Sequence, residues 1–431
     1  MPNKLSFNKK IKESIEYANK FNTKFAFLFI DLDLFKRIND TLGHIKGDEL
    51  LIIVANRLKE KIRKIDFISR IGGDEFLLII DRLDKNNESN KLINNILDCF
   101  NKPFILDNLN FNITCSIGVS FYPDHSNNAV DIQKYADIAM YNAKEKGRNN
   151  VVIFDDKMKK GLMNELILSN DMIRAIENDE FILYYQPQVN SNEEHIIGVE
   201  ALIRWNHPEL GFLTPYHFID LAEKTGQIIE IGKFVIEKAA KDLRIWKDKG
   251  LIDNFKISVN ISPKQFVTDE LISFIKFIMK KYNHNPKDFE FEIAESVAMD
   301  KSSNSIDILN ELKKCGFSFS IDDFGMKYSS LKYIKNMPVD KIKIDKFFVD
   351  GIGIDKANEA IIKTIIALAK NLDLSIVAEG VETKNQLTFM ENNDCKIIQG
   401  YYYYKPISPI KIEKILKDNL YIYKKKIKFL N

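Results

Sequence analysis

Apolar residues in the first third of the chain follow both the helical and the strand period. Residues 5–21 predict an amphipathic helix, residues 24–33 an apolar strand, and residues 47–62 a second helix. Residues 67–80 predict two strands joined by a Gly-Gly turn. The remaining predicted elements are a helix near 88–101, a strand at 111–122, a helix at 131–146 and a short strand at 150–154. The order β-α-β-β-α-β predicts a split, ferredoxin-like α+β sandwich over residues 1–155.

The rest of the chain has a more regular rhythm, and residues 166–420 predict a second domain. Helix-like stretches, such as residues 232–249 and 358–372, separate most of its apolar strand candidates. The candidates are residues 181–189, 196–205, 255–262, 289–296, 317–323, 341–345, 375–381 and 396–403. Eight such units in about 250 residues predict a (β/α)8 barrel. We place a linker at residues 156–165 and a basic C-terminal tail at residues 421–431.

Composition narrows the class of protein. The 431 residues are 45% hydrophobic and 29% charged, with a net charge of +2, which are ordinary globular values. So small a net charge argues against nucleic acid as a partner, and no apolar run reaches the length of a membrane span. The four cysteines lie far apart without CxxC spacing, which predicts reduced thiols and a cytoplasmic location.

Polar side chains recur near the ends of the strand candidates in the second domain. In a barrel these ends meet at one rim, where so many acids would repel one another unless cations lay among them. A single polar strand end can also be merely solvated. The recurrence favours a shared site, made of Glu200, Asn260, Glu292, Glu295, Asp322, Asp323, Lys343, Asp345, Glu379, Glu382 and Gln399.

The side-chain types at this rim indicate which metal they suit. Oxygen ligands from Glu, Asp and Asn favour Mg²⁺ or Mn²⁺ over zinc, and no histidine falls at a strand end. Adjacent Asp322 and Asp323 can face each other across a divalent cation. Two such cations a few ångströms apart serve phosphodiester cleavage. Lys343, on the same rim, could orient or deprotonate the attacking water.

The first domain repeats this theme on a smaller scale. Two acids share a face at the end of its first strand, and two more follow the Gly-Gly turn, where backbone can approach a bulky ligand. A surface turn with ordinary acids is the alternative. With basic residues late in the domain, the acids predict Mg²⁺ held on a nucleoside triphosphate. The acids are Asp31, Asp33, Asp74 and Glu75, and the phosphate contacts are Lys144 and Arg148.

Two short strings identify a resemblance to a known family. Residues 72–76, Gly-Gly-Asp-Glu-Phe, resemble the GGDEF signature of diguanylate cyclase domains. Residues 200–202, Glu-Ala-Leu, resemble the EAL signature of cyclic-di-GMP phosphodiesterase domains. Surrounding strings such as DLDLFKRIND, SVNIS, IDDFG, AEGVET and QGYYYYKP make the match specific. The resemblance covers nearly the whole chain and implies a bacterial protein with a cyclase-type domain followed by an EAL-type barrel.

The resemblance assigns roles in the first domain residue by residue. Two GTP molecules, each with Mg²⁺, would meet across two facing domains, so the cyclase reaction implies a homodimer. Arg63 and Asp66 match the RxxD pair of the family's product-binding inhibitory site. The other matches are the metal-binding and catalytic carboxylates Asp31, Asp74 and Glu75, the guanine-reading pair Asn39 and Asp48, and the phosphate contacts Lys36, Lys144 and Arg148.

In the second domain the resemblance implies two cations, Mg²⁺ or Mn²⁺, and opening of cyclic di-GMP to linear pGpG. Lys343 matches the residue that activates water, and Glu295 matches the residue that supports the loop after the aspartate pair. Glu200, Asn260, Glu292 and Asp322 match the ligands of one metal, and Asp322, Asp323 and Glu379 match those of the other. We assign the substrate side to Gln186, Arg204, Asp345, Glu382 and Gln399.

The chain departs from the family's usual pattern at three places. The cyclase-like domain begins late, since Pro2-Asn3-Lys4 resembles only the tail of the usual opening stretch, and we expect the sensory input to be missing or separate. Lys327 stands where the family usually has glycine, which predicts altered regulation with the metal ligands unaffected. Ala294 stands where the family usually has a threonine, and this position also bears on the support of the same loop.

These features predict an enzyme that hydrolyses cyclic di-GMP. Its cyclase-type domain either makes cyclic di-GMP from two GTP or binds GTP to regulate hydrolysis. The alternative is a catalytically weak or inactive receptor for cyclic di-GMP or GTP that acts through protein partners. Every metal-ligand position of the second domain matches, which favours turnover.

Overall fold

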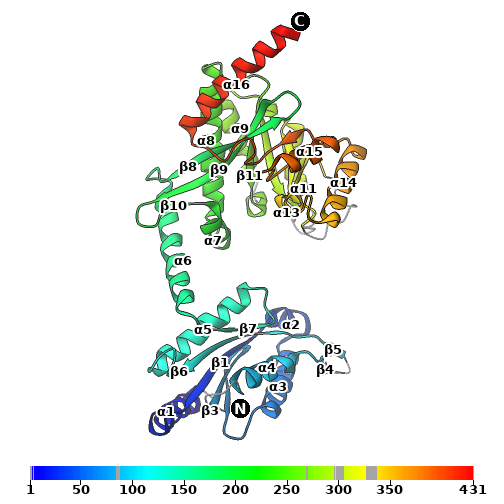
Figure 1. Cartoon of the computed structure of the whole chain (residues 1–431). Coiled ribbons are helices and arrows are strands. Elements are labelled where there is room, and N and C mark those ends of the chain that lie inside the picture. Colours follow the sequence, from blue (N-terminus) through cyan, green and yellow to red (C-terminus); the bar gives the residue numbers. More distant parts are fainter. Residues whose placement is uncertain are drawn as a thin grey trace. The chain divides into compact units, whose positions relative to one another are not determined.

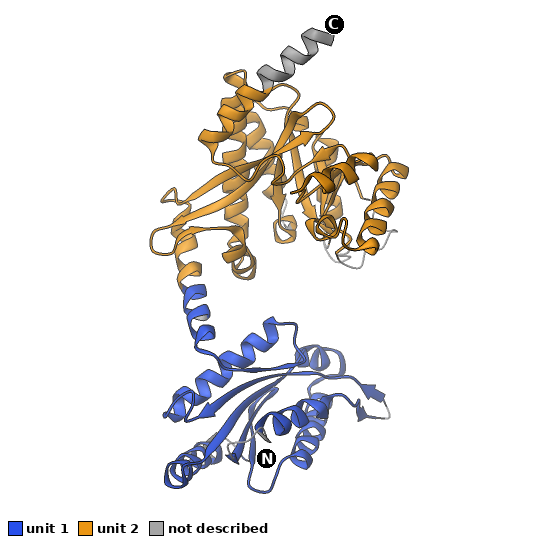
Figure 2. Cartoon of the chain, in the orientation of Figure 1, with its two compact units in different colours: residues 1–166 blue, residues 167–431 orange. Residues whose placement is uncertain are grey.

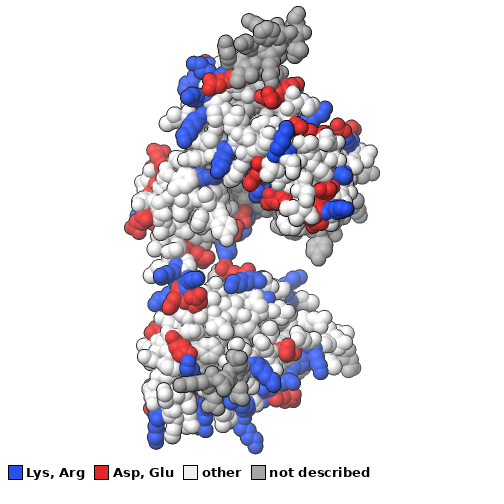
Figure 3. Space-filling model, viewed as in Figure 1, with Lys and Arg blue, Asp and Glu red and all other residues white. Residues whose placement is uncertain are grey.

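The computed structural model consists of two compact units, residues 1–166 and residues 167–431 (Figure 2). It describes residue 2 and residues 4–83, 88–107, 109–267, 270–295, 297, 305–326 and 337–430. The segment at residues 156–165, expected as a linker, lies within helix α6 (Asp156–Ala175). Acidic and basic side chains are interspersed on the face drawn in Figure 3, in keeping with the net charge of +2.

Unit 1 is built on a five-stranded sheet with the strand order β2-β3-β1-β6-β7 (Figure 1). Its strands are β1 (Lys24–Leu32), β2 (Phe67–Gly72), β3 (Glu75–Leu83), β6 (Cys115–Tyr122) and β7 (Asn150–Ile153). All neighbours are antiparallel except β6 and β7. The order of the first four strands is that of a split β-α-β-β-α-β fold, which confirms the predicted class.

Helices cover both faces of this sheet because its strands present apolar side chains to each face in turn. On β1, Ala26 and Leu28 pack with residues of α3 and α4, whereas Phe25 and Phe27 pack with residues of α1 and α5. The helices are α1 (Lys4–Phe21), α2 (Phe35–Leu42), α3 (His44–Lys61), α4 (Glu88–Leu97) and α5 (Ala129–Glu145). A small hairpin of β4 (Phe104–Leu106) and β5 (Leu109–Phe111) was not predicted.

Unit 2 is an eight-stranded barrel. Hydrogen bonds join its strands in the order β8-β9-β11-β12-β13-β14-β15-β16, and β16 pairs with β8 to close the ring. The strands are β8 (Phe181–Asn190), β9 (His195–His207), β11 (Lys256–Ile261), β12 (Phe289–Ala294), β13 (Ser318–Phe324), β14 (Lys341–Ile344), β15 (Ser375–Ala378) and β16 (Ile397–Ile398). A ninth strand, β10 (Gly211–Leu213), extends the sheet beside β9.

Helices lie outside the barrel and follow most of its strands (Figure 1). They are α7 (Ile219–Thr225), α8 (Ile228–Asp248), α9 (Glu270–Lys281), α11 (Ser305–Lys314), α13 (Lys346–Asp350), α14 (Lys356–Asn371), α15 (Lys384–Asn392) and α16 (Pro409–Leu430). The segment expected as a C-terminal tail begins within α16. In the part of the chain that the structure describes, no helix is long and apolar enough to cross a membrane.

One strand departs from the parallel arrangement of a regular (β/α)8 barrel. β8 runs antiparallel to both β9 and β16, whereas the pairs from β9 through β16 are parallel. Only residues 191–194 join β8 to β9, and a parallel pair needs a much longer crossover. The sequence already held this signal, because no helix-like stretch separates those two strand candidates.

Tyr185 and Asp242 join the barrel wall to α8 through a buried hydrogen bond. Tyr185 Oη donates to Asp242 Oδ2 at 2.6 Å, and Lys238 Nζ donates to the other carboxylate oxygen at 3.2 Å. Burial and the nearby carboxylate raise the pKa of Tyr185 well above its usual value, so the hydroxyl keeps its proton. The bond therefore satisfies an acid that is 5% exposed.

Replacing Tyr185 by phenylalanine is expected to lower the free energy of unfolding by about 1–3 kcal/mol, because Asp242 would lose a buried donor. Urea denaturation of the full chain measures this change. Tyr216→Phe is the matched control, since Tyr216 is 90% exposed, and it should change stability by less than about 0.5 kcal/mol. Equal stabilities of the two variants would contradict the role given to this bond.

Candidate active site

A β-bulge brings two adjacent aspartates to the same site. β13 and β14 pair in register except at one point near their ends. There β13 contains two residues, Asp322 and Asp323, whereas β14 contains only Lys343. Asp323 has a φ of 52°, a left-handed conformation that aspartate tolerates better than most residues. In a regular strand the two carboxylates would point to opposite faces. The bulge therefore lets both acids act at the rim of the barrel, where its parallel strands end.

Lys343 lies at the centre of the acids on the rim. Its Nζ is 2.6 Å from Glu379 Oε1, 3.1 Å from Asp322 Oδ1 and 3.5 Å from Glu200 Oε2, and it also contacts Glu292. The lysine side chain is only 1% exposed, so these ion pairs form out of water. One ammonium group thus faces four carboxylates.

The surplus of acids raises the pKa of several carboxyl groups at the rim. Burial, together with neighbouring acids, raises the pKa of Glu379 to about 8 and that of Asp323 to about 7. Burial and the carboxylate of Glu200 also raise the pKa of Glu292 well above its usual value. Burial alone would lower the pKa of Lys343, but the surrounding carboxylates raise it well above its usual value. The site therefore holds protons near neutral pH that a metal cation could displace.

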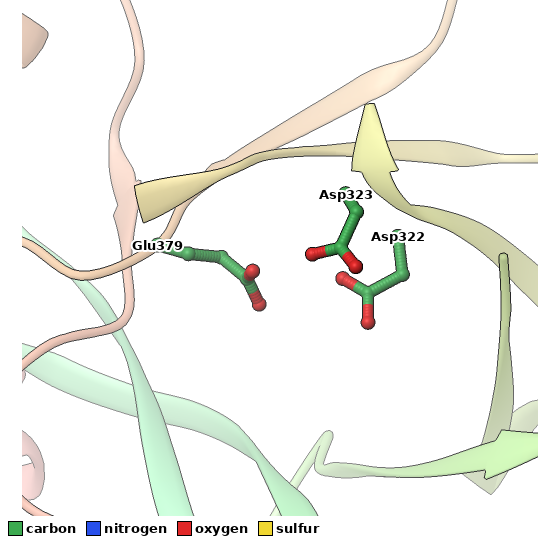
Figure 4. Close-up of side chains that lie close together, drawn as sticks. All are labelled: Asp322, Asp323 and Glu379. Atoms are coloured by element: carbon green, nitrogen blue, oxygen red, sulfur yellow. The ribbon is translucent and has the colours of Figure 1, made fainter. Parts of the chain in front are cut away.

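Asp322, Asp323 and Glu379 form a group that fits a divalent cation. One oxygen from each lies within 4.8 Å of the other two. Figure 4 shows the three carboxylates turned toward a common space, with the aspartates on β13. Glu292 provides further support for a cation here, because its buried Oε1 has no hydrogen-bond partner. Carboxylate oxygens of this kind are the ligands that hard cations prefer.

Glu200 and Asn260 extend the site to the neighbouring strands. Asn260 Nδ2 donates to Glu200 Oε1 at 2.7 Å, and Gln399 Nε2 donates to Glu200 Oε2 at 2.5 Å. Burial opposes ionisation of Glu200, but Lys343 and these hydrogen bonds outweigh it and lower the pKa of that carboxyl. The structure therefore brings the predicted ligands of both cations to one rim.

A cavity of about 330 Å³ opens beside these acids. Gln399 Nε2 donates to Gln186 Oε1 at 3.4 Å within its wall, and Glu382 pairs with Lys346 at 2.7 Å. The lining includes three of the predicted substrate-side residues and three of the predicted metal ligands: Gln186, Glu382, Gln399, Glu200, Asp322 and Glu379. A ligand in this cavity would lie directly against the acids.

Two other residues predicted on the substrate side, Arg204 and Asp345, lie outside the lining of this cavity. An Arg204 guanidinium nitrogen donates to the backbone oxygen of Ile203, and the group lies 5.6 Å from the centre of the Tyr184 ring. Asp345 Oδ1 accepts from Phe347 N at 2.7 Å and so caps α13, and the Asp345 carboxyl also hydrogen-bonds with that of Asp323, whose pKa it helps to raise. Neither residue lines the 330 Å³ cavity, so their substrate role stays a prediction.

The loop after the aspartate pair begins at Gly325. Its backbone N–H points to Glu295 Oε2 at 3.4 Å, which is the contact expected of a residue that supports this loop. Gly325 has a φ of 95°, and a Cβ there would lie 3.2 Å from the Phe348 ring. Any side chain at this turn would therefore be strained, which favours glycine. Lys327, the departure from the family pattern, lies outside the described residues.

In unit 1, the first strand and the Gly-Gly turn bring acids together. Asp31 on β1 is paired in register with Glu75 on β3. Lys144 Nζ, from α5, lies 2.7 Å from Asp31 Oδ2. Burial is the main cause that raises the pKa of Asp31 and of Glu75, and the charge of Asp74 adds to both. These three acids lie near one another, but among the described residues only the acids of the barrel rim have their oxygens gathered within 4.8 Å, so a cation site in unit 1 stays a prediction.

The residues predicted to bind a nucleotide have few internal partners. Asn39 has a buried amide oxygen without a hydrogen-bond partner, and a Cβ on Gly47 would lie only 1.9 Å from it. Glycine at position 47 therefore leaves room for that amide. Lys36, Asp48 and Arg148 are exposed, so a ligand can reach them.

Arg63 and Asp66, the predicted regulatory pair, are engaged with each other. The Asp66 carboxylate accepts from the Arg63 backbone N–H at 2.8 Å, from its guanidinium at 2.8 and 3.1 Å, and from Asp81 N at 3.1 Å. Arg63 also donates to the backbone oxygen of Asp81 at 2.6 Å. The Asp66 side chain is 2% exposed. The RxxD turn is therefore held by an internal ion pair.

Asp33 does not share the role expected of Asp31. It lies just beyond β1, and its buried carboxylate accepts from Thr114 Oγ1 and Ser116 Oγ, both at 2.7 Å. It also accepts from Asn149 N at 3.1 Å. With three donors already bound, Asp33 ties three segments of unit 1 together instead of facing a cation.

Asp137 on α5 is a residue near this site that the sequence analysis missed. Burial raises the pKa of Asp137, and its charge in turn raises the pKa of Glu75. Asp137 precedes Lys144 by two helical turns and so lies on the same face of α5. That spacing was a usable signal in the sequence.

Comparisons with known proteins cover both units. The description "Diguanylate cyclase, GGDEF domain" matches residues 1–150, and the description "EAL domain" matches residues 169–406. The bifunctional diguanylate cyclase/cyclic di-GMP phosphodiesterase MucR of Pseudomonas aeruginosa is 38% identical over 94% of this chain and 59% of that protein. The signaling protein YkoW of Bacillus subtilis is 38% identical over 93% of this chain and 50% of that protein. The chain thus spans between 50% and 59% of the length of these relatives.

A solved structure is similar to part of this chain. It is described as "PaMucR Phosphodiesterase, c-di-GMP complex", is 39% identical, and covers 57% of this chain and 99% of its own, with a TM-score of 0.55. The EAL match alone covers more than half of the chain, and the GGDEF match covers most of the remainder. The family that the two signatures predicted is therefore confirmed, and the chain belongs to the tandem GGDEF–EAL family of cyclic-di-GMP signalling proteins.

Proposed function

We propose that unit 2 hydrolyses cyclic di-GMP to linear pGpG with the help of Mg²⁺ or Mn²⁺. The observation that carries this proposal is the crowding of carboxylates around one ammonium group, that of Lys343, with Asp323 beside them. An ion-pair network that served stability alone would balance its charges, whereas this one has a surplus of acids. A relative and a solved structure, both described as cyclic-di-GMP phosphodiesterases, support the same substrate.

The donor set fits two divalent cations. The buried, unpartnered Oε1 of Glu292 and the three grouped carboxylates are oxygens that such cations would satisfy. When bound, the cations polarise the phosphate and lower the pKa of water. One would be held by Glu200, Asn260, Glu292 and Asp322, and the other by Asp322, Asp323 and Glu379.

The side chains of the barrel would supply the remaining chemistry. Lys343 keeps its proton while four carboxylates surround it, and it loses part of this stabilisation once those acids serve as ligands. It can then orient the attacking water and hold a proton taken from it. The water oxygen forms a bond to phosphorus, the P–O3′ bond breaks, and the 3′-oxygen leaves with a proton. Gln186 and Gln399 line the cavity where the substrate would be oriented.

We also propose that unit 1 binds GTP with Mg²⁺. The observations that support it are the Asp31–Glu75 pair bridged to Lys144 and the unpartnered amide oxygen of Asn39. Synthesis of cyclic di-GMP would require two such units to face each other, and therefore a homodimer. Regulation of hydrolysis by bound GTP would not. Because both nucleotides are cytoplasmic, we place the two units in the bacterial cytoplasm.

Incubating the full chain with cyclic di-GMP and Mn²⁺ is expected to release pGpG, which chromatography measures. Glu200→Gln should lower the rate by about 100-fold or more, because the site loses a charged ligand. Glu209→Gln is the control, since Glu209 is exposed, and it should keep the full rate. Binding of cyclic di-GMP by the unaltered chain without any pGpG would refute hydrolysis and favour a receptor.

The affinity for Mn²⁺ should rise between pH 6 and pH 8. Binding must displace protons from Asp323, with a pKa of about 7, and from Glu379, with a pKa of about 8, so affinity increases as these groups ionise. We expect a gain on the order of 100-fold, measured by calorimetric titration of chelator-treated protein. Asp323→Asn should bind more weakly and show a shallower dependence on pH. Parallel pH profiles would exclude Asp323 as a ligand.

GTP should bind to unit 1, and Asp31→Asn should weaken the binding of its Mg²⁺ complex by about tenfold because a ligand charge is lost. Fluorescence titration with a labelled GTP measures the affinity, and Glu60→Gln, at an exposed position of α3, is the control. Adding GTP to the Glu200→Gln variant tests the cyclase reaction, since its product would not be consumed. Unchanged GTP affinity in Asp31→Asn would count against this site.

A further inference from the structure

Below the acids of the rim, the barrel holds a second buried ion pair that the proposed mechanism does not use. Lys341 Nζ on β14 donates to Glu290 Oε1 on β12 at 2.7 Å, and Ser258 Oγ on β11 donates to the same oxygen at 3.2 Å. Lys341 is 7% exposed and Glu290 is 0% exposed. Barrel interiors of this kind are usually filled by branched apolar side chains. A charged pair in this place therefore calls for a reason other than filling space.

The pair spans β13 just below the bulge, one rung before the last regular pair, which is Ile321 with Ile342. Ser320 on β13 is matched in register with Lys341 on one side and with Glu292 on the other. β12 and β14 are not hydrogen-bonded to each other, because β13 lies between them. The side chain of Lys341 thus connects two strands across a small residue. Above the rung of Ile321 and Ile342 the pairing of β13 with β14 becomes irregular, and the aspartate pair lies there.

Each member of the pair lies two residues before a member of the rim. Lys341 precedes Lys343, and Glu290 precedes Glu292, so each set lies on one face of its strand. A shift of β14 against β12 would therefore move Lys343 against Glu292 by the same amount. Main-chain hydrogen bonds resist such a shift only through β13, and the bulge interrupts them at the level of the site. The ion pair is a direct restraint between the two strands.

We propose that Lys341 and Glu290 are positioning residues for the rim. Their ion pair fixes β14 relative to β12 and so keeps Lys343, Glu292 and the aspartate pair at the spacing that divalent cations require. This inference rests on the proposed function for its cations. Stability alone is a poor explanation of the pair, because well-packed apolar residues in place of a buried ion pair are often equally or more stable.

The test is a double variant, Lys341→Met with Glu290→Leu, which removes both charges at similar volume. Its melting temperature should equal or exceed that of the unaltered chain, whereas each single variant leaves a buried unpaired charge. The double variant should bind Mn²⁺ at least about tenfold more weakly, as measured by the electron paramagnetic resonance signal of the free ion. Its kcat for pGpG should fall about tenfold or more, with KM changed less than about twofold.

Lys256→Met is the matched control for these measurements. Lys256 Nζ donates to Ser318 Oγ at 2.8 Å, and both residues lie at the starts of their strands, at the end of the barrel away from the rim. The control should keep the Mn²⁺ affinity and the kcat. Wild-type Mn²⁺ affinity and kcat in the folded double variant would overturn the positioning role, and so would an equal loss in the control.

A second variant covers the case in which the double variant does not fold. Glu290→Gln keeps the volume and an acceptor for Lys341 but removes the ion pair, and it should weaken Mn²⁺ binding by about threefold or more. Unchanged affinity in this variant overturns the role. Absence of Mn²⁺ binding to the unaltered chain would refute the metal site of the proposed function itself, and the positioning role with it. If the unaltered chain binds Mn²⁺ and only the variants of Lys341 and Glu290 lose affinity, both the metal site and the positioning role are supported.

Discussion

Repulsion among carboxylates at the mouth of the barrel is the constraint on which unit 2 depends. The strands must bury their apolar faces, and doing so drives the acids at their ends into one small space. Lys343 offsets part of the repulsion through its four ion pairs. Protons retained on Glu379 and Asp323 offset more of it, since the pKa values of both are raised toward or beyond neutrality. Folding thus creates the crowding of acids, and this crowding prepares the site to bind cations.

The bulge in β13 shows how local backbone geometry sets the chemistry. Two neighbouring side chains normally face apart in a strand, so a pair of adjacent acids cannot serve one site without an irregularity. The left-handed backbone conformation of Asp323 provides this irregularity. Its small conformational cost is offset by the surrounding hydrogen-bonded strands. The antiparallel β8 has a comparable effect, because it sets Gln186 in register with Glu200. Both departures from the regular barrel thus lie at the candidate site.

Much of this could be read from the sequence, for identifiable reasons. The strand period and the polar residues at strand ends placed Glu200, Asn260, Glu292 and Glu379 on one rim, because parallel strands of a closed barrel must end together. The hairpin of β4 and β5 was missed because three-residue strands carry too little periodicity. Asp33 was placed with Asp31 from alternation alone, which cannot show that β1 ends at Leu32.

Side-chain contacts between residues far apart in the chain could not be predicted from the sequence. That Lys341 reaches Glu290, and that Arg204 turns to Tyr184, depends on the stagger between strands and on side-chain directions. The bulge was not predicted either, since a run of apolar residues followed by two acids fits a regular strand equally well, and only the assignment of both acids to one cation implied an irregularity. The sequence thus predicted which residues gather, whereas their partners had to come from three-dimensional packing.

The internal ion pair of the RxxD turn has a consequence for how unit 1 would respond to an anion. Any phosphate that binds Arg63 must compete with the Asp66 carboxylate and with the backbone oxygen of Asp81. Only the fraction of molecules in which Arg63 has swung free would be competent, and the apparent dissociation constant rises in inverse proportion to that fraction. The internal ion pair would therefore lower the affinity of this turn for an anion, so half-saturation would need a higher anion concentration.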